Sequence, residues 1–434
     1  MASDGRSDRW KERPLNDTIF ALSSGSLPAA IAVVRISGPE ARHALEALGG
    51  VAEPRRARLA TLSWDGEVLD RALTLFFDGP ATATGEDVAE LHLHGGRAVV
   101  AAILAALSRL PRLRPAESGE FTRRSFQHGR IDLAEAEGLA DLLAAETESQ
   151  RRAALRLASG SLSRKVAAWT SVLLQISAAV EAELDFSDED DVPSDTDWRR
   201  AASALLKDVD QLLSQPTVER LTEGIRVVIA GPPNAGKSSL LNALVGREAA
   251  ITSPHAGTTR DVIEAPAVIA GVPILFMDTA GLRSSDDEVE AIGIDRARRV
   301  LDNADIILWL GAPNERPAGE NVLVVHSKTD LAGSAEGADI AVSALTGTGL
   351  AELLAMLHQR SETMLPLSDD VLNRRHQDVI REAVVHLGGA IEATDLLIVA
   401  EELRLVRRLF DGITGRTGVE NMLDTLFARF CIGK

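Results

Sequence analysis

Residues 227–238 read Val-Val-Ile-Ala-Gly-Pro-Pro-Asn-Ala-Gly-Lys-Ser, an apolar run that leads directly into the pattern G-x-x-x-x-G-K-S. The run predicts a buried strand, and residues 239–244 predict a helix directly after the loop. Glycines let backbone N–H groups approach phosphates, and the helix N-terminus adds partial positive charge. A chance glycine-rich turn is the alternative for the octet alone. The loop residues expected to contact nucleotide are Asn234, Ala235, Gly236, Lys237, Ser238 and Ser239.

Short apolar runs continue through this part of the chain and alternate with helical stretches. They are VVIA at 227–230, ILFMD at 274–278, IILWL at 306–310, VLVVH at 322–326 and DIAVS at 339–343. This alternation predicts a parallel sheet with crossover helices. The link 311–320 is shorter than a helical crossover normally needs, so we expect its helix to be nearly absent.

Further motifs follow the expected strands in order. Thr259 is expected to complete the magnesium shell that begins with Ser238, and Asp278 to hold magnesium through water. Asp330 follows a strand and is expected to accept two hydrogen bonds from the guanine edge, which adenine cannot supply. The remaining contacts expected from these motifs are Gly257, Thr279, Ala280, Gly281, Lys328, Ser343, Ala344 and Leu345. Together the motifs predict a GTPase.

Two positions depart from the usual pattern. Ser327 stands where the guanine motif Asn-Lys-x-Asp has Asn, and a hydroxyl makes only part of the carboxamide's hydrogen bonds. Leu282 stands where Ras-like enzymes use Gln to orient water. Another group must therefore supply that function.

Composition bounds the rest of the chain. With 434 residues, two or three domains are expected. The net charge of −18 argues against broad, unaided nucleic-acid binding. No apolar run is long enough to span a membrane, and the polar residues 1–14 are expected to form a disordered tail rather than a signal peptide. A single cysteine, Cys431, excludes an intramolecular disulfide and fits a reducing cytoplasm.

The pattern divides the chain into segments. Residues 15–129 mix strands and helices, residues 130–222 and 363–434 are mainly helical, and residues 223–362 form the GTPase segment. The GTPase segment is expected to be inserted between two helical segments that pack together. The acidic run 185–191 lacks the spacing of a calcium loop and is expected to be solvated.

Stretches outside the GTPase segment resemble the MnmE (TrmE) family from about Asp17 to Lys434. They are 17–38, TGEDVAELHLHGG at 84–96, GEFTRRSF at 119–126, GRIDLAEAE at 129–137, AEELR at 400–404 and FCIGK at 430–434. The resemblance implies a multidomain α/β plus all-α fold: an N-terminal α+β tetrahydrofolate-binding-like domain, a helical domain and an inserted P-loop (Ras-like) GTPase domain.

The same resemblance implies how hydrolysis is catalysed. A potassium ion replaces the arginine finger, held by Asn234 and by the switch loop at Ser253, His255 and Thr258, and Glu290 positions the attacking water. The phosphate-loop pattern itself predicts that Lys237 bridges the terminal phosphates. The nucleotide contacts then also include Pro254 and Ala256. Without the resemblance, a turn residue would be the better interpretation of Asn234, and a solvated helix face that of Glu290.

The N-terminal domain is implied to form a homodimer and to bind a folate donor, 5,10-methylene- or 5-formyl-tetrahydrofolate. The matching positions are Arg35, Glu90, Arg130 and Lys434; surface charges are the alternative for each. Ala83 departs from the aromatic residue that the family commonly carries there. His92 and His94 lie on one face of an expected strand, but without a third ligand a metal pair is disfavoured.

The implied function is cytoplasmic tRNA modification with an MnmG (GidA)-type flavoprotein, in a heterotetramer. The pair would add an aminomethyl or carboxymethylaminomethyl group to carbon 5 of the wobble uridine, with FAD and NADH on the partner. The rival interpretation is a regulatory GTPase that binds a ribosome-assembly intermediate. Cys431 is left as either a catalytic thiol or a buried small hydrophobe.

Overall fold

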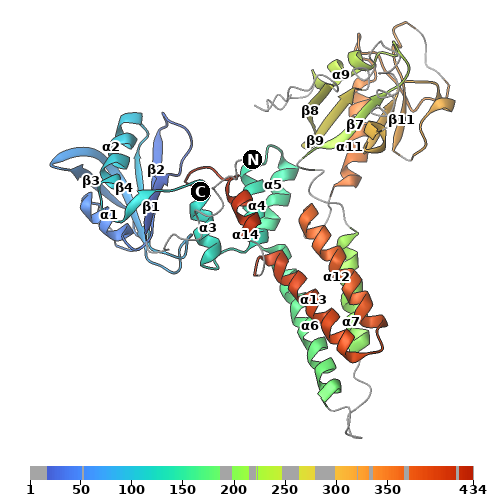
Figure 1. Cartoon of the computed structure of the whole chain (residues 1–434). Coiled ribbons are helices and arrows are strands. Elements are labelled where there is room, and N and C mark those ends of the chain that lie inside the picture. Colours follow the sequence, from blue (N-terminus) through green and yellow to red (C-terminus); the bar gives the residue numbers. More distant parts are fainter. Residues whose placement is uncertain are drawn as a thin grey trace, which may run out of the picture. The chain divides into compact units, whose positions relative to one another are not determined.

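The computed structural model describes residues 17–50, 53–185, 198–214, 221, 223–246, 263–278, 299–319, 321–331, 336–365, 371–416 and 420–433. These form two compact units, which are described separately. The first takes its residues from Met1–Ala140, Ala158–Ala167 and Arg407–Lys434, and the second from Asp141–Leu157 and Ala168–Val406. Figure 1 shows the elements along the chain.

The first unit contains a six-stranded mixed sheet of order β3-β4-β5-β2-β1-β6. Only the β1–β6 pair is parallel among its neighbouring strands. The strands are β1 (Thr18–Leu22), β2 (Ile31–Ser37), β3 (Arg58–Trp64), β4 (Glu67–Phe77), β5 (Val88–His94) and β6 (Leu113–Pro115). The mixture of strands and helices expected for this part of the chain is confirmed: the apolar run 29–36 contains most of β2, and the run 72–77 forms the carboxyl-terminal part of β4.

Helices α1 (Ala41–Ala47) and α2 (Arg97–Ser108) cover one face of this sheet. Alternate residues of β2, such as Val34 and Ile36, enter that core and are fully buried, as the two-residue period of a strand requires. The opposite face carries Arg35 from β2 and Glu90 from β5. That face is partly covered by α3 (Glu120–Gln127), whose Phe121 packs with Ile19.

The carboxyl-terminal stretch also belongs to this unit. Helix α14 (Glu420–Phe427) packs against α4 (Leu133–Ala144) through Leu426 and Phe427. Beyond it, Ile432 pairs with Ser118 in an isolated bridge. Gly433 lies so close to the Leu22 carbonyl that an added Cβ would stand 2.2 Å from that oxygen. The chain therefore returns to the end of β1.

The second unit contains a six-stranded sheet of order β12-β11-β10-β7-β9-β8. Its strands are β7 (Ile225–Ala230), β8 (Ile263–Ile269), β9 (Val272–Asp278), β10 (Ile306–Trp309), β11 (Val322–His326) and β12 (Ile340–Ala341). The five expected parallel strands are confirmed. The edge strand β8 runs antiparallel to β9, which the alternation of apolar runs did not predict.

Helices α9 (Lys237–Val245) and α11 (Leu350–Met364) contribute to the core of this sheet. The expected near-absence of a helix between β10 and β11 is confirmed, because the described part of that link holds only the three-residue 3-10 helix η2 (Pro313–Glu315).

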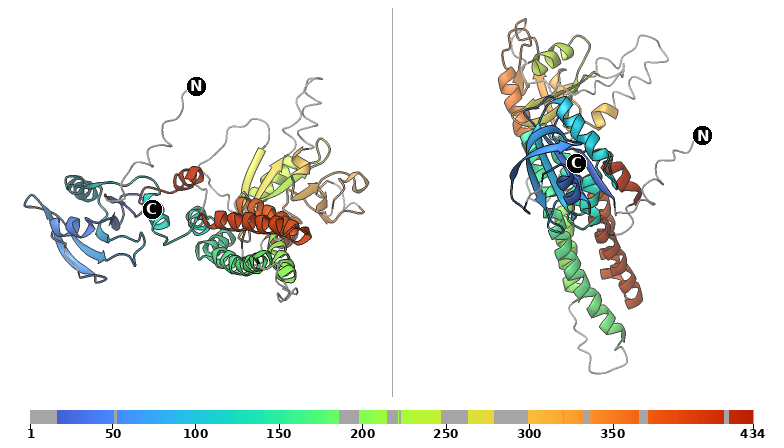
Figure 2. Two further views of the ribbon diagram at one scale, coloured as in Figure 1. Left: turned by 60° about the horizontal axis from the view of Figure 1, so that its bottom comes forward. Right: turned by 90° about the vertical axis from the view of Figure 1, so that its left-hand side faces the viewer.

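The long helices of the second unit lie side by side (Figures 1 and 2). Trp169 of α6 donates to Asp208 of α7, Arg199 of α7 donates to the carbonyl of Ala393 after α12, and His386 of α12 bonds Glu402 of α13. The segments before and after the nucleotide-binding sheet therefore pack together. These helices are α6 (Ser161–Asp185), α7 (Trp198–Leu213), α12 (Arg374–Glu392) and α13 (Leu396–Thr414); the first residues of α6 and the last of α13 are assigned to the first unit. The shorter α5 (Glu148–Ala158) also lies in the second unit, except for its last residue.

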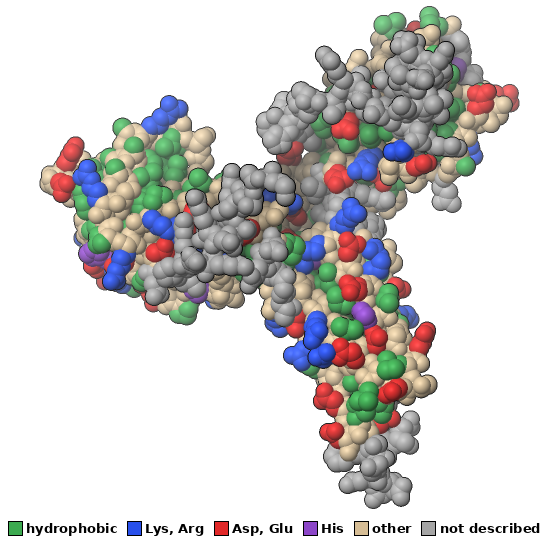
Figure 3. All heavy atoms as spheres, viewed as in Figure 1, with side chains coloured by type: hydrophobic (Ala, Val, Ile, Leu, Met, Phe, Trp, Pro, Cys, Tyr) green, Lys and Arg blue, Asp and Glu red, His purple; other side chains and the backbone are tan. Residues whose placement is uncertain are grey.

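None of the helices in the described parts of the chain combines the length and apolar character needed to cross a membrane. On the face in Figure 3, acidic and basic side chains are interspersed over the long helices.

Candidate nucleotide and cofactor sites

The phosphate loop connects β7 to α9, as the sequence predicted. Asn234 and Gly236 both adopt left-handed backbone conformations, with φ of 60° and 93°. The two bends turn the chain from β7 into the first turn of α9, with Gly236 as the N-cap residue. Lys237 is only 9% exposed, and its Nζ donates to the carbonyls of Gly231 (3.1 Å) and Pro232 (2.9 Å). The ammonium is therefore already held inside the loop.

The two groups expected near magnesium meet at one edge of the sheet. Asp278 is fully buried at the last position of β9, opposite Ile229 of the parallel neighbour β7. Because parallel strands present their carboxyl ends at the same edge, Asp278 lies beside the loop that follows β7. Ser238 Oγ donates to Asp278 Oδ2 over 2.6 Å. A hydroxyl and a carboxylate oxygen are suitable donors for magnesium.

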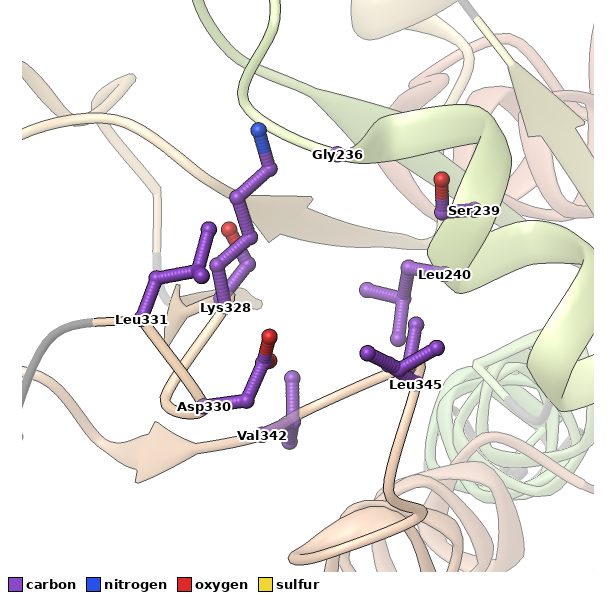
Figure 4. Close-up of a pocket in the computed structure, with 10 residues that line it drawn as sticks. Gly236, Ser239, Leu240, Lys328, Asp330, Leu331, Val342 and Leu345 are labelled. Carbon is purple, nitrogen blue, oxygen red and sulfur yellow. The ribbon is translucent and has the colours of Figure 1, made fainter.

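A cavity of about 180 Å³ lies where the guanine pocket is expected (Figure 4). The Asp330 carboxylate points into it, with Lys328 and Leu331 on one side and Leu240 and Leu345 on the other. Ser343, fully buried, donates to Asp330 Oδ1 over 2.5 Å and so orients that carboxylate. The lining residues are Gly236, Ser239, Leu240, Ser327, Lys328, Asp330, Leu331, Val342, Ala344 and Leu345.

Two adjacent residues tie the base pocket to the phosphate loop. Ser327 Oγ donates to the carbonyl of Ala235 over 2.5 Å, and Lys328 Nζ donates to the carbonyl of Asn234 over 2.7 Å. Lys328 itself has a positive φ of 61°. The hydroxyl that replaces the usual Asn therefore still makes a cross-loop bond.

The pocket includes three residues that sequence reasoning missed: Leu240, Leu331 and Val342. Leu331 directly follows Asp330 in the chain and is 79% exposed. An apolar residue directly after the Asp of the base-recognition motif is the sequence signal that could have indicated it. Leu240 and Val342 carry no such signal, because they are ordinary apolar positions of a helix and a strand end.

Several expected site residues lie outside the described residues. They are Ser253, Pro254, His255, Ala256, Gly257, Thr258, Thr259, Thr279, Ala280, Gly281, Glu290 and Lys434, together with Leu282. Of the acidic run, only Asp185 is described.

The first unit brings two expected folate residues together. Arg35 and Glu90 are directly opposed on β2 and β5, and Arg35 Nη2 lies 2.8 Å from Glu90 Oε1. The other oxygen of Glu90 lies 3.3 Å from His92 Nε2. The ring of Phe121 lies 6.0 Å from the Arg35 guanidinium. Glu90 is thus held from both sides on the face opposite the helical core.

Arg130 lies elsewhere on this unit, where its Nε donates to the carbonyl of Thr82 over 3.2 Å. His94 bonds Asp70, so the two histidines of β5 have separate partners. Within the described residues, no group of three or more side chains is arranged to hold a metal ion. Cys431 is exposed, so the interpretation of it as a buried small hydrophobe is wrong.

A parallel sheet with a phosphate loop, a buried carboxylate beside its serine and a guanine-type pocket defines the class: this is a P-loop GTPase with an additional mixed-sheet domain and a helical domain. Two family models agree with that division. "GTP-binding protein TrmE N-terminus" matches residues 18–130, and "MnmE helical domain" matches residues 133–431.

Curated relatives extend over nearly the whole chain. Proteins named "tRNA modification GTPase MnmE" are 53% identical in Novosphingobium aromaticivorans (97% of this chain, 100% of that protein) and 54% in Rhizorhabdus wittichii (96% and 97%). The protein of that name from Zymomonas mobilis is 51% identical (96% and 100%). The chain therefore belongs to the MnmE (TrmE) family, and it is a GTP-hydrolysing enzyme.

Proposed function

We propose that this GTPase modifies the wobble uridine of certain tRNAs together with an MnmG (GidA)-type flavoprotein. Support comes from the names of its near full-length relatives and from the presence of a GTP pocket and the Arg35–Glu90 pair in one chain. The two proteins form a cytoplasmic heterotetramer. This complex adds an aminomethyl or carboxymethylaminomethyl group to carbon 5 of the wobble uridine. The one-carbon unit comes from a folate, and FAD and NADH belong to the partner.

Nucleoside analysis of tRNA from cells that lack this gene tests the proposal. Loss of the modified wobble uridine, restored by the wild-type gene and not by a Lys237→Ala variant, is the expected result. Normal wobble uridines in the deletion strain would overturn the assignment and favour a regulatory GTPase.

Magnesium fits the residues that meet at the carboxyl edge of the sheet. Ser238 and Thr259 would ligate it, and Asp278 would hold it through water. When bound, the ion neutralises phosphate charge. Lys237, now held by two loop carbonyls, would turn its ammonium to the terminal phosphates.

A potassium ion is proposed to supply the positive charge that an arginine finger supplies elsewhere. Asn234 would hold it with Ser253, His255 and Thr258, and Glu290 would orient the attacking water. Asn234 is exposed at the bend of the loop, with its backbone carbonyl occupied by Lys328, so its side chain is presented outward. Turnover in potassium should exceed turnover in sodium at equal ionic strength. Equal rates would contradict the Asn234 assignment.

A folate is proposed to bind at Arg35, Glu90, Arg130 and Lys434. A carboxylate suits the amide edge of a pterin, and guanidinium and ammonium groups suit a glutamate tail. The Glu90 carboxylate stays partly exposed while Arg35 and His92 hold it, which leaves it able to accept further hydrogen bonds.

Calorimetry with 5-formyl-tetrahydrofolate tests this site. Glu90→Gln should weaken binding about 10- to 100-fold, the value of a charged hydrogen bond. Glu67→Gln, at the exposed first residue of β4, is the matched control. Unchanged affinity in Glu90→Gln would remove Glu90 from the site.

Homodimerisation is supported by apolar side chains on the open face of the first sheet. Leu59 and Leu73 are directly opposed and 56% and 37% exposed, and Ile31 is 60% exposed. Burial of such side chains in a partner removes apolar area from water. Leu73→Glu should shift the mass measured by light scattering from dimer to monomer. Leu397→Glu, also exposed but on α13, should not.

A further inference from the structure

Helix α5 begins with a reciprocal cap that needs only Thr147 and Gln150. The backbone N–H of Gln150 donates to Thr147 Oγ1 (3.2 Å), and the backbone N–H of Thr147 donates to Gln150 Oε1 (2.8 Å). This arrangement satisfies two helix-end donors, as in a capping box. Ser149 is the second residue of α5, and its hydroxyl is therefore not required for the cap.

Gln150 also joins α5 to the chain that enters the GTPase sheet. Its Nε2 donates to the carbonyl of Leu221 over 2.7 Å. Ala153, Leu221 and Val371 form a buried apolar cluster, against which Leu365 packs. Leu221 precedes β7, and Leu365 and Val371 follow α11, so α5 is attached to both connections of the GTPase domain.

Ser149 makes a different contact. Its Oγ donates to the carbonyl of Gly271 over 2.7 Å, and it lies 3.1 Å from Thr147 Oγ1. Because Thr147 Oγ1 already accepts from the backbone, its own proton is available to Ser149. The Ser149 proton is then directed at Gly271.

Gly271 lies at the tip of the β8–β9 hairpin. Ala270 and Gly271 form the tight turn with positive φ of 47° and 86°, as two-residue hairpin loops require. Seven pairs run in register from Ile269–Val272 at the tip to Ile263–Asp278 at the other end. Seven residues of strand span about 20 Å. The far end of the hairpin is thus Asp278, the carboxylate bonded to Ser238.

We propose that Ser149 is a positioning residue that couples the nucleotide site to the helical domain through this hairpin. The inference rests on the proposed function and on one added expectation, that GTP binding and hydrolysis change the conformation of the GTPase domain. The hairpin is paired along its whole length and β9 also pairs with β7, so the hairpin moves with the sheet that carries Asp278. A displacement of that sheet relative to α5 therefore reaches Gly271. At Gly271 the displacement changes the hydrogen bond from Ser149. Gln150 and the apolar cluster meanwhile keep α5 attached to the segments that enter and leave the GTPase domain. The contact between the hairpin and α5 is thus the place where we expect the two nucleotide states to differ.

Hydrogen–deuterium exchange of the full-length protein, loaded with GDP or with GDP–aluminium fluoride, tests the proposal. In the wild type, exchange in α5 should differ between the two states. Ser149→Ala should reduce that difference about 2- to 10-fold, the equilibrium value of one hydrogen bond. Affinity for GDP should stay unchanged, which separates coupling from damage to the nucleotide site.

Two variants complete the test. Ser149→Thr keeps the hydroxyl and should restore the difference. Ser203→Ala removes an exposed serine on α7 whose hydroxyl donates to the carbonyl of Arg199 in the same helix, and it should behave as wild type. An undiminished difference in Ser149→Ala, or no difference in an active wild type, would overturn the coupling alone. A wild type that hydrolyses no GTP would overturn the proposed function as well.

Discussion

Ser238 Oγ and Asp278 Oδ2 lie 2.6 Å apart, one on the first turn of α9 and the other at the end of β9. The two side chains stand 40 positions apart in the sequence, yet a shared hydrogen bond brings them together where magnesium is expected. The contact depends on β7 and β9 being adjacent parallel strands.

Replacement of Asp278 by Asn should raise the magnesium concentration needed for half-maximal GTP turnover about 10- to 100-fold, the usual effect of losing an outer-shell partner. The substitution keeps the size of the side chain and removes the charge. A magnesium titration of GTP hydrolysis measures the effect. Asp302→Asn, an exposed carboxylate, is the control. An unchanged magnesium requirement would contradict a role for Asp278 near the ion.

Asp330→Asn should reverse the base preference of the pocket. The carboxylate accepts from the guanine edge, whereas a carboxamide also donates, which suits the second carbonyl of xanthine. Affinity for GTP should fall about 10- to 100-fold because a charged hydrogen bond is lost, and affinity for XTP should rise. Competition of GTP and of XTP against a fluorescent GDP analogue measures the two dissociation constants. Equal losses for both would mean that Asp330 only supports the loop.

Ser327→Ala should weaken GTP and GDP equally, about 2- to 10-fold, because it removes one hydrogen bond between the base loop and Ala235. Ser327→Asn should bind at least as tightly as the wild type, since a carboxamide offers more hydrogen-bonding groups than a hydroxyl. Equilibrium binding of both nucleotides to the three proteins checks this. If the Ser327→Ala variant binds both nucleotides as tightly as the wild type, the hydrogen bond from Ser327 to Ala235 contributes nothing to nucleotide affinity.

The N-terminal unit should lose stability in acid through a buried carboxylate cluster. Arg124 is 2% exposed and contacts Asp17, Glu86 and Glu120. Burial alone would raise the pKa of Glu120, but the hydrogen bond and charge of Arg114 outweigh it and lower that pKa. The pKa of Asp17 is likewise lowered by Arg114 and Arg124 against the effect of burial.

A lowered folded-state pKa means that the carboxylates stabilise the fold above their unfolded values of about 4. This contribution is fully present at neutral pH and is lost as the pH falls through the lowered folded values. Glu120→Gln should lower the free energy of unfolding by about 3 kcal/mol at pH 7, because buried guanidinium groups lose a charged partner. This loss of unfolding free energy should become smaller below pH 4, where the wild-type carboxylates begin to be protonated. Denaturant unfolding at pH 7 and pH 3 measures it; a cost independent of pH would contradict the charge argument.

The nucleotide-binding half of the fold could be predicted closely because its signals are local. A β-branched run such as 225–230 predicts a buried strand. The left-handed bends after it fall on Asn234 and Gly236, two residue types that tolerate a positive φ. The antiparallel edge strand β8 was missed because its direction depends on the turn at Ala270 and Gly271, which no apolar pattern reports.

The N-terminal site was predicted as separate charges, Arg35 and Glu90, and their pairing was not. Which residues oppose each other across β2 and β5 depends on strand register, and a shift of one strand by one residue would place the two side chains on opposite faces. The same holds for Arg124, whose burial among three carboxylates has no counterpart in its local sequence.

The sequence by itself determined the class of protein, the order of its nucleotide motifs and the residues expected to contact GTP, because each motif is a short stretch whose backbone conformation and chemistry are local. Only the tertiary structure decided that Ser327 reaches Ala235, that Glu90 is held by Arg35 and His92, and that Ser149 meets Gly271. These contacts join residues that strand register, helix packing and hairpin geometry bring together, and none of those is set by the residues adjacent in the chain.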